Sequence, residues 1–370
     1  MKDIYQEIVQ ELSQGREIVL ATIIRQKGSA PRTQGTQFVI RPDGTFIGTI
    51  GGGRLEADVL TAAPRVFTER KNRILYFRLK GEEVAETEMI CGGEVDIYLE
   101  LLSGQNPFDL DLFQKALEFR ETGRPGLLAT LLEDSQSADR RDGKFLVVPD
   151  EDPDLDAYPW ISPFWKHLPQ VLEGNQARLM TALLQGEEKK VFLEPLMAPS
   201  CLYIFGAGHI SLYLCTLGKM VGFRVAVFDD RAEFANPQRF PEADEIRVGP
   251  FEQLLDDYLF GPNAFIVVVT RGHLHDHQII KKVLTNPSRY IGMIGSRHKR
   301  GVVFKALKEE GFPEDRIHSI HSPIGLDIQA ETPEEIAVSI VAELIQVRGE
   351  GRAKKTKGRL PALDPLSPRP

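Results

Sequence analysis

The order of hydrophobic and polar residues in the first part of the chain predicts a mixed domain of helices and strands. Residues 2–14 follow an amphipathic helical period, and three strand-like runs broken by glycine and proline come next. A second helix, at about 55–70, leads into RILYFRL and EVDIYLELL, which alternate as half-buried strands do. This mixture is typical of an α+β fold.

Residues 107–198 extend this pattern. Residues 107–122 predict a helix, and two later runs, GLLATLLED and VFLEPL, predict strands on either side of an acidic stretch that contains proline and tryptophan. Because we find no helical partner near these late strands, we expect them to join the sheet of the first domain. The first domain then spans residues 1–198, with its late strands between 126 and 196.

From residue 199 to 348 strands and helices alternate regularly. Near-continuous apolar strands such as FIVVVT are what a parallel sheet covered on both faces requires, and we count six strands. The sequence thus predicts an α/β protein: an N-terminal α+β domain followed by a C-terminal Rossmann-like, doubly wound parallel sheet. The basic, proline-rich segment 349–370 lacks apolar periodicity, so we expect it to be disordered.

Composition narrows the class of protein. With 42% hydrophobic and 26% charged residues, this 370-residue chain resembles ordinary globular proteins. It has no apolar stretch long enough for a membrane span and no secretory leader, so we expect a cytoplasmic protein. Three cysteines, Cys91, Cys201 and Cys215, are too few for a disulfide framework. A net charge of −8 argues against nucleic-acid binding.

A glycine-rich turn opens the first helix of the second domain. Gly206 and Gly208 follow a strand, where such turns let backbone amides approach a pyrophosphate, although Ser211 stands at the third glycine position. His209 at the crest of the loop either faces a bound group or lies in solvent. Asp229, at the end of the next strand, stands where a ribose-binding acid belongs. The loop favours a nucleotide-like ligand.

Titratable side chains follow a later strand of this domain, in the run TRGHLHDH at 270–277. Arg271, His273 and Asp276 therefore lie at the edge of the sheet where doubly wound folds bind ligands. His273 and His277 share one face if this run is helical, and with Asp276 they suit zinc or nickel. Contact with an anion or cofactor, or a capping role for Asp276, is the alternative.

The next strand also ends in a turn that suits an anion. Ser296 and Arg297 lie in this Gly-Ser turn, which leads into a helix with several basic side chains. A third loop, residues 321–328, follows the last predicted strand. Three strand ends are therefore expected to meet at one place.

The first domain carries an independent set of glycine loops. Three consecutive glycines that run into a helix present backbone amides to an anion, and neighbouring arginines add positive charge. Cys91 lies in a turn beside two glycines, where a helix end or an arginine would favour its thiolate. The alternative for Cys91 is a small buried hydrophobe. The candidate contacts in this domain are Arg32, Gly51, Gly52, Gly53, Arg54, Cys91, Gly92 and Gly93.

Both sets of loops resemble the XdhC/CoxI family, accessory factors for molybdenum hydroxylases such as xanthine dehydrogenase and carbon monoxide dehydrogenase. At Arg54, many members carry a second cysteine instead. The matching segments span both domains: GSAPR at 28–32, GTIGGGRLE at 48–56, ICGGEVDIYLE at 90–100, IFGAGHIS at 204–211, VFDDR at 227–231, TRGHLHD at 270–276, IGMIGSRHKR at 291–300 and SPIGLDIQAETPEEIAVSIVAEL at 322–344.

The resemblance implies a non-catalytic or weakly catalytic helper. Such a protein binds the molybdenum cofactor, a pterin with a phosphate and a dithiolene, as molybdopterin or its dinucleotide form. Cys91 is then a possible molybdenum ligand. The helper supports sulfuration of the cofactor by a cysteine desulfurase and hands it to an apo molybdenum hydroxylase. A homodimer is expected by analogy with other cargo-carrying accessory proteins.

The residues alone leave two other functions open. An NAD(P)-dependent oxidoreductase would hold its nucleotide at Gly206, Gly208 and Asp229 and use the histidines as acid–base groups. A metal-dependent hydrolase would use His273, Asp276 and His277. The first predicts binding of NADH or NADPH, and the second predicts stoichiometric metal.

Overall fold

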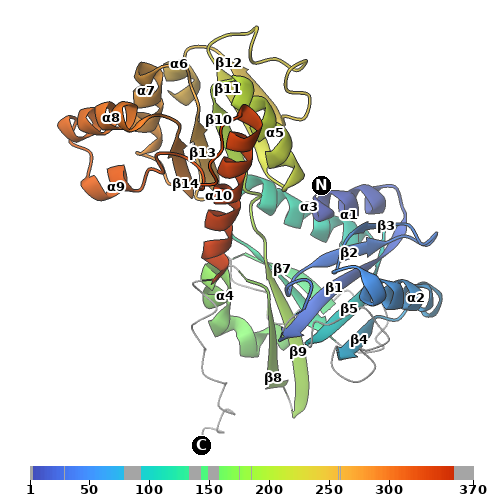
Figure 1. Cartoon of the computed structure of the whole chain (residues 1–370). Coiled ribbons are helices and arrows are strands. Elements are labelled where there is room, and N and C mark those ends of the chain that lie inside the picture. The colour runs from blue at the N-terminus through green and yellow to red at the C-terminus, as the bar shows by residue number, and fades with distance from the viewer. Residues whose placement is uncertain are drawn as a thin grey trace, which may run out of the picture. The chain divides into compact units, whose positions relative to one another are not determined.

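The structure of the chain is a computed structural model. The chain divides between Ala198 and Pro199 into two compact units, whose elements are labelled in Figure 1. Each unit has hydrophobic cores of its own. We call these units the N-terminal unit and the C-terminal unit. The structure describes residues 3–28, 30–78, 93–132, 143–148, 158–174, 176–184, 186–256, 258 and 260–353.

The first sheet of the N-terminal unit is antiparallel, with the strand order β3-β2-β1-β5-β4. Its strands are β1 (Glu17–Lys27), β2 (Gln37–Ile40), β3 (Phe46–Gly48), β4 (Arg73–Arg78) and β5 (Glu94–Ser103). Alternate residues of β1 point to opposite faces: Val19 and Ala21 pack against helix α2 (Gly53–Glu69), while Ile18 and Leu20 pack with α1 (Ile4–Ser13) and α3 (Pro107–Thr122). Helices therefore cover both faces of this sheet.

Helix α3 has the bounds that the sequence predicts, because both of its ends are marked chemically. The Asn106 side chain accepts a hydrogen bond from the Phe108 amide at 3.1 Å, and Pro107 occupies the first turn. At the other end Gly123 adopts a φ of 71°, a left-handed conformation that ends the helix.

The late strands form a second sheet, so the expectation that they join the first sheet is wrong. Strands β6 (Leu127–Leu132), β7 (Lys144–Val147), β8 (Arg178–Leu184) and β9 (Glu187–Pro195) pair antiparallel in the order β7-β6-β9-β8. Their helical partner comes from the region between β7 and β8, for which the hydrophobic pattern predicts no element. The 3-10 helix η3 (Pro159–His167) buries Trp160, Ile161 and Phe164 against this sheet, and α4 (Leu168–Gly174) buries Leu168 and Val171.

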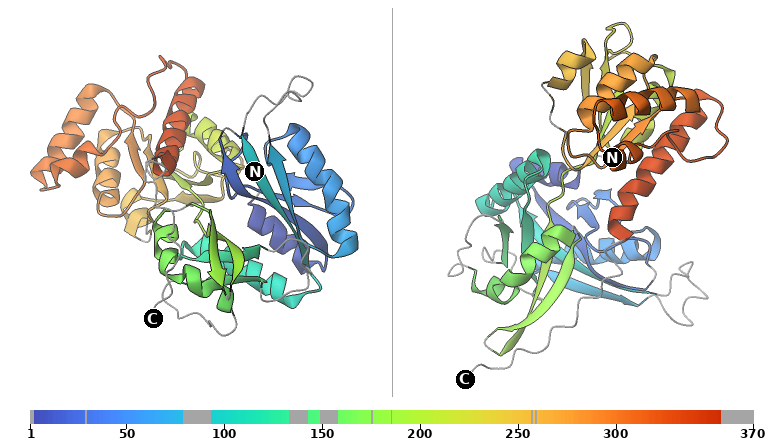
Figure 2. Two further views of the ribbon diagram at one scale, coloured as in Figure 1. Left: turned by 90° about the horizontal axis from the view of Figure 1, so that it is seen from below. Right: turned by 90° about the vertical axis from the view of Figure 1, so that its left-hand side faces the viewer.

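The C-terminal unit is a doubly wound α/β fold, as predicted. All strands of its sheet are parallel and follow the order β12-β11-β10-β13-β14. Figure 2 shows helices on both faces of this sheet. The chain moves outward from β10 through β11 to β12 and then returns to the other side of β10, so the ligand edge of such folds lies at the carboxyl ends of β10 and β13.

Strands and helices alternate in the C-terminal unit, except that β12 directly follows β11 and that three helices end the unit. They are β10 (Cys201–Phe205), α5 (His209–Met220), β11 (Arg224–Asp229), β12 (Glu245–Val248), α6 (Phe251–Asp256), β13 (Ala264–Val268), α7 (His273–Val283), β14 (Tyr290–Met293), α8 (Arg297–Glu309), α9 (Glu314–His318) and α10 (Pro333–Ala353).

The sixth predicted strand of this sheet does not form. Ile317 enters the core from the short helix α9, and only His321 forms a bridge, to Gly292 of β14. The apolar residues of IHSI therefore pack from a helix and a turn. A short apolar run does not distinguish these from a strand.

Helix α10 extends beyond the predicted end of the folded domain at residue 348. It continues to Ala353, so the first residues of the predicted disordered tail are helical, and the remainder, 354–370, lies outside the described residues. Neither α10 nor any other helix in the described part of the chain is long and apolar enough to cross a membrane.

Candidate functional site

Gly28 and Gly93 of the N-terminal unit lie at one end of its first sheet. Strands β1 and β5 run antiparallel, with Lys27 opposite Glu94. Gly28, which opens the GSAPR segment, directly follows Lys27, and Gly93, which closes ICGG, directly precedes Glu94. The register therefore brings Gly28 and Gly93 together at the end of the sheet.

The triple glycine joins the same place through a close contact. Gly51, Gly52 and Gly53 have φ values of 127°, 77° and 60°, which side-chain-bearing residues rarely adopt. A Cβ atom on Gly51 would lie 2.5 Å from Cγ of Pro31, in the GSAPR segment. A Cβ atom on Gly52 would have no neighbouring atom within 4 Å, so the middle of the loop is open.

A carboxylate of the same chain already accepts hydrogen bonds from the donors of this loop. Oε1 of Glu56, in the first turns of α2, accepts hydrogen bonds from the Thr49 hydroxyl at 2.6 Å and from the amides of Ile50 at 3.1 Å and Gly52 at 2.9 Å. The Gly51 amide donates to the Thr49 hydroxyl at 3.1 Å. These amides are therefore not bare, contrary to what the glycines alone suggest. Burial raises the pKa of Glu56, but the bonds from Thr49 and the amides outweigh it, and the net pKa is lowered.

The two arginines of this region are exposed. In the described part of the chain, the Arg32 side chain has no ion pair or hydrogen bond, while Arg54 lies 3.5 Å from Asp58 across one turn of α2. Gly93 is buried. Cys91 and Gly92 lie outside the described residues, so the structure gives no position for the candidate thiol.

The other two cysteines are poor candidates for thiol chemistry. Cys215 is 2% exposed, and burial raises the pKa of its thiol to about 11. Burial likewise raises the pKa of Cys201, which opens β10. Both thiols stay protonated at neutral pH, which leaves Cys91 as the candidate nucleophile or ligand.

A carboxylate also accepts a hydrogen bond from the glycine loop of the C-terminal unit. Asp229, at the end of β11, is 1% exposed, and its Oδ2 accepts from the Ala207 amide at 2.6 Å. Arg231 donates to both oxygens of Asp229, at 2.9 and 3.1 Å. Burial raises the pKa of Asp229, but the hydrogen bonds from Arg231 and the Ala207 amide have the larger effect, so its pKa is lowered overall. The acid expected to bind ribose is therefore already paired on both oxygens.

The remaining loop residues divide between the interior and solvent. His209 is exposed, whereas Ser211 is buried and its hydroxyl donates to the Gly206 carbonyl. Gly206 has a φ of 104°, and a Cβ there would lie 2.7 Å from the carbonyl oxygen of Val269. The loop after β10 thus lies directly against the end of β13.

Asp276 is the centre of a buried polar cluster at this edge. Its side chain is 0% exposed, accepts a hydrogen bond from the Thr270 hydroxyl and forms an ion pair with Lys299 of α8. Burial raises the pKa of Asp276 despite both partners. Sequence reasoning identified Asp276 but missed Thr270, which lies in the loop just before α7, and Lys299, whose proximity depends on how α7 and α8 pack.

The histidines do not gather around a common centre. Nε2 of His277 lies 3.2 Å from a carboxylate oxygen of Glu310, the residue that follows α8, and the ring of His275 packs against Phe251 with 5.3 Å between centroids. His273 begins α7, but its side chain is not among those described. Within the described ranges, no three His, Cys, Asp or Glu side chains are grouped to hold a metal ion.

The last predicted contacts are exposed. Arg271 donates to Asp230 at 3.0 Å, and Arg297 begins α8 and has no hydrogen bond or ion pair to another residue of the described ranges. Ser296 caps α8, since its hydroxyl accepts from the Lys299 amide at 3.2 Å. This edge therefore carries more than one accessible cation.

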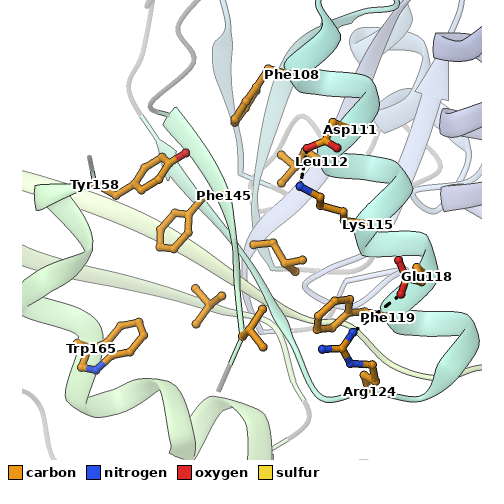
Figure 3. A pocket seen from close by; sticks show the side chains of 13 residues that line it. Phe108, Asp111, Leu112, Lys115, Glu118, Phe119, Arg124, Phe145, Tyr158 and Trp165 are labelled. Atoms are coloured by element: carbon orange, nitrogen blue, oxygen red, sulfur yellow. Dashed lines mark ion pairs between the residues drawn. The ribbon is translucent and has the colours of Figure 1, made fainter. Parts of the chain in front are cut away.

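A separate cavity of about 520 Å³ lies in the N-terminal unit, between α3 and β7 (Figure 3). Aromatic rings line it, among them Phe108, Phe145, Tyr158 and Trp165. The charged groups on its α3 side are paired with each other, as Lys115 is with Asp111 at 2.9 Å. None of the predicted contact residues lines this cavity.

These two units define a class of protein: an antiparallel α+β unit with glycine loops beside exposed arginines, followed by a Rossmann-type unit. Residues 202–344 match the XdhC Rossmann domain, and residues 11–78 match the XdhC and CoxI family. The chain belongs to the XdhC/CoxI family.

One relative and one solved structure are similar over nearly the whole chain, and a second relative is similar over about a quarter of it. A Bacillus subtilis (strain 168) protein, named as a probable xanthine dehydrogenase subunit, is 28% identical over 91% of this chain and 95% of its own length. The molybdenum cofactor insertion chaperone PaoD of Escherichia coli (strain K12) is 29% identical over 27% of this chain and 31% of its own length. A crystal structure described as a xanthine dehydrogenase from Bacillus halodurans has a TM-score of 0.71 and 26% identity, with 97% of this chain and 98% of the other covered.

Proposed function

We propose that this chain is an accessory factor that binds the molybdenum cofactor and delivers it to a molybdenum hydroxylase of the xanthine dehydrogenase or carbon monoxide dehydrogenase type. The observation that carries the proposal is that Gly28 and Gly93 flank a paired position of β1 and β5 at one end of the first sheet, while Gly51 of the triple glycine lies against Pro31 of GSAPR. The relatives named as part of a xanthine dehydrogenase and as a cofactor insertion chaperone support it.

The residues at this place suit a phosphate-bearing pterin as cargo. Arg32 and Arg54 are exposed cations that can bind a phosphate. Glu56 already accepts hydrogen bonds from the amides of Ile50 and Gly52. The phosphate is therefore bound by these arginines and by the first backbone amides of α2. Cys91, in the segment that ends at the same place, supplies a thiolate, a ligand class that soft metals prefer.

The proposal also includes a cysteine desulfurase as partner, a homodimeric state and a location in the cytoplasm. A cysteine desulfurase supplies sulfur to the bound cofactor before it passes to the apo-enzyme, and the chain works as a homodimer in the cytoplasm. The family resemblance supports the first partner, and analogy with other delivery proteins supports the dimer. Co-purification with a cysteine desulfurase and light scattering of the purified chain test these points separately.

The central test measures the fluorescent pterin released from chain purified with its cargo. We expect Cys91→Ser and Arg32→Ala each to reduce the pterin-to-protein ratio severalfold. Arg65→Ala, an exposed arginine of α2 outside these loops, is the matched control and should retain the pterin. Full pterin content in both Cys91→Ser and Arg32→Ala would remove the site from the proposal.

The oxidoreductase alternative has a test of its own. Since both oxygens of Asp229 are hydrogen-bonded within the chain, we expect neither NADH nor NADPH to bind at millimolar concentration. Fluorescence titration of the full chain measures this directly. Saturable binding of either dinucleotide would favour the oxidoreductase instead.

A further inference from the structure

The proposed function does not explain why Asp276 and Lys299 form a largely buried ion pair. The Asp276 side chain is 0% exposed and that of Lys299 is 20% exposed. Taking two charges out of water costs about as much free energy as their attraction returns, so such a pair is weak evidence for stability. It lies between the first turns of α7 and α8, at the ligand edge of the sheet.

The stem of Lys299 packs closely over Gly295 at this edge. A Cβ atom on Gly295 would lie 2.8 Å from Cδ of Lys299, so a side chain there would require the lysine stem to shift. The Thr270 hydroxyl fixes the carboxylate of Asp276 that the ammonium group contacts. A lysine ammonium has three donors, and Asp276 is its one ion-pair partner within the described ranges, so donors remain for a ligand.

The glycine loop adjoins the same cluster. A Cβ on Gly206 would lie 2.7 Å from the Val269 carbonyl oxygen and 3.1 Å from Cα of Thr270. Helices α5 and α7 begin after Gly208 and Gly272, and neither cap residue has a side chain to bond the first amides. Backbone donors of α5 follow β10 and Lys299 follows β14, the strands on either side of β13, and Thr270 and Asp276 follow β13 itself.

The surrounding charges indicate the class of ligand. Exposed Arg271 and Arg297 add positive charge to this edge, whereas Asp229 has no free oxygen for a ribose hydroxyl. We propose that the C-terminal unit binds the phosphate of a diphosphate or phosphate ester through Lys299, which Asp276 and Thr270 hold in place, and that it does not bind an adenine dinucleotide. The ester belongs either to a nucleotide or to a phosphorylated pterin.

Calorimetric titration of the full chain with inorganic pyrophosphate tests this site. We expect saturable binding that Lys299→Met weakens by about tenfold or more, as loss of a charge-assisted phosphate contact does. Lys305→Met, an exposed lysine on the same helix, is the matched control and should bind as the parent chain does. Titration with ADP identifies the source: tighter binding than pyrophosphate assigns the phosphate to a nucleotide, and no gain assigns it to a non-nucleotide ester.

A double variant separates loss of the binding site from misfolding of the single variant. Lys299→Met alone leaves a buried carboxylate without its partner, so Lys299→Met with Asp276→Asn removes both charges. Undiminished pyrophosphate binding by this double variant, or none by the parent chain, overturns the inference. The site lies in a different unit from the pterin loops, so Arg32→Ala should leave pyrophosphate binding unchanged, and the two proposals can fail separately.

Discussion

Glu56 and Asp229 act alike at the residue scale, although they lie in unrelated loops. Each carboxylate accepts backbone amide hydrogen bonds in a glycine-rich turn that the sequence marks as an anion site. The glycines therefore do two things: they allow the turn, and they let a side chain of the same chain reach its amides. An external anion must use the donors that these carboxylates leave free.

Glu56 should accordingly stabilise the triple-glycine loop. Glu56→Ala leaves the amides of Ile50 and Gly52 without acceptors, which should lower the free energy of unfolding by about 1–3 kcal/mol. Glu56→Gln keeps one carbonyl acceptor and should lose less. Urea unfolding measures both, with Asp58→Ala on the same helix as an exposed control. A loss from Asp58→Ala as large as that from Glu56→Ala would contradict this role.

Asp109 predicts a pH dependence of the opposite sign from most carboxylates. Burial raises its pKa from 3.8 to about 6, although the Ser103 amide donates to it at 2.9 Å. The folded state therefore binds a proton more tightly than the unfolded state, and this residue adds stability as the pH falls from about 6 towards 4. Asp109→Asn keeps an acceptor for Ser103 and should gain roughly 1–3 kcal/mol at pH 7.

Unfolding in urea at a series of pH values from 7 to 4 checks this prediction. The Asp109→Asn profile should be flatter than that of the parent chain over this window. Asp111→Asn, whose carboxylate is exposed and paired with Lys115, should leave the profile unchanged. An Asp109→Asn chain less stable than the parent at pH 7 would show that the charged carboxylate is favourable there.

At the scale of elements, hydrophobic periodicity predicts what is local and fails for what depends on packing. Helix α3 has its predicted bounds because Asn106 and Gly123 mark its ends in the sequence itself. The separate second sheet follows from the residues of η3 that cover it, and their proline-rich sequence carries no clear period. The same holds for the site: the glycines and Asp276 were predictable, whereas contact with Lys299 requires α7 beside α8.

Glu343 fixes helix α10 to the edge of the parallel sheet. It accepts hydrogen bonds from the Tyr290 hydroxyl and, at 2.8 Å, from the Gly325 amide, and its Oε1 lies 2.8 Å from Nδ1 of His321. Burial raises the pKa of Glu343, but His321, Tyr290 and Gly325 lower it overall. A lowered carboxyl pKa gives stability that is present above the unfolded value and lost as the pH falls through the folded one.

Glu343→Gln should therefore destabilise the protein at neutral pH, by about 1–3 kcal/mol. The difference from the parent chain should shrink below about pH 4, where the parent's own carboxyl becomes protonated. Urea unfolding at pH 7 and pH 3.5 measures the two differences. Glu334→Gln, at the start of α10, changes only an exposed hydrogen bond with Tyr213 and should cause a much smaller loss. A Glu343→Gln deficit that is the same at both pH values would exclude titration of this group as its cause.

For the whole molecule, each proposed binding region lies within one unit, and each unit contains its own cores and complete sheets. We therefore expect residues 199–353, expressed alone, to unfold cooperatively in urea and to bind pyrophosphate as the full chain does. Residues 1–198 should retain the pterin. A fragment that begins at residue 224 lacks β10, the central strand of the parallel sheet, and should not fold. If residues 199–353 fold but bind no pyrophosphate while the full chain does, that site requires the N-terminal unit.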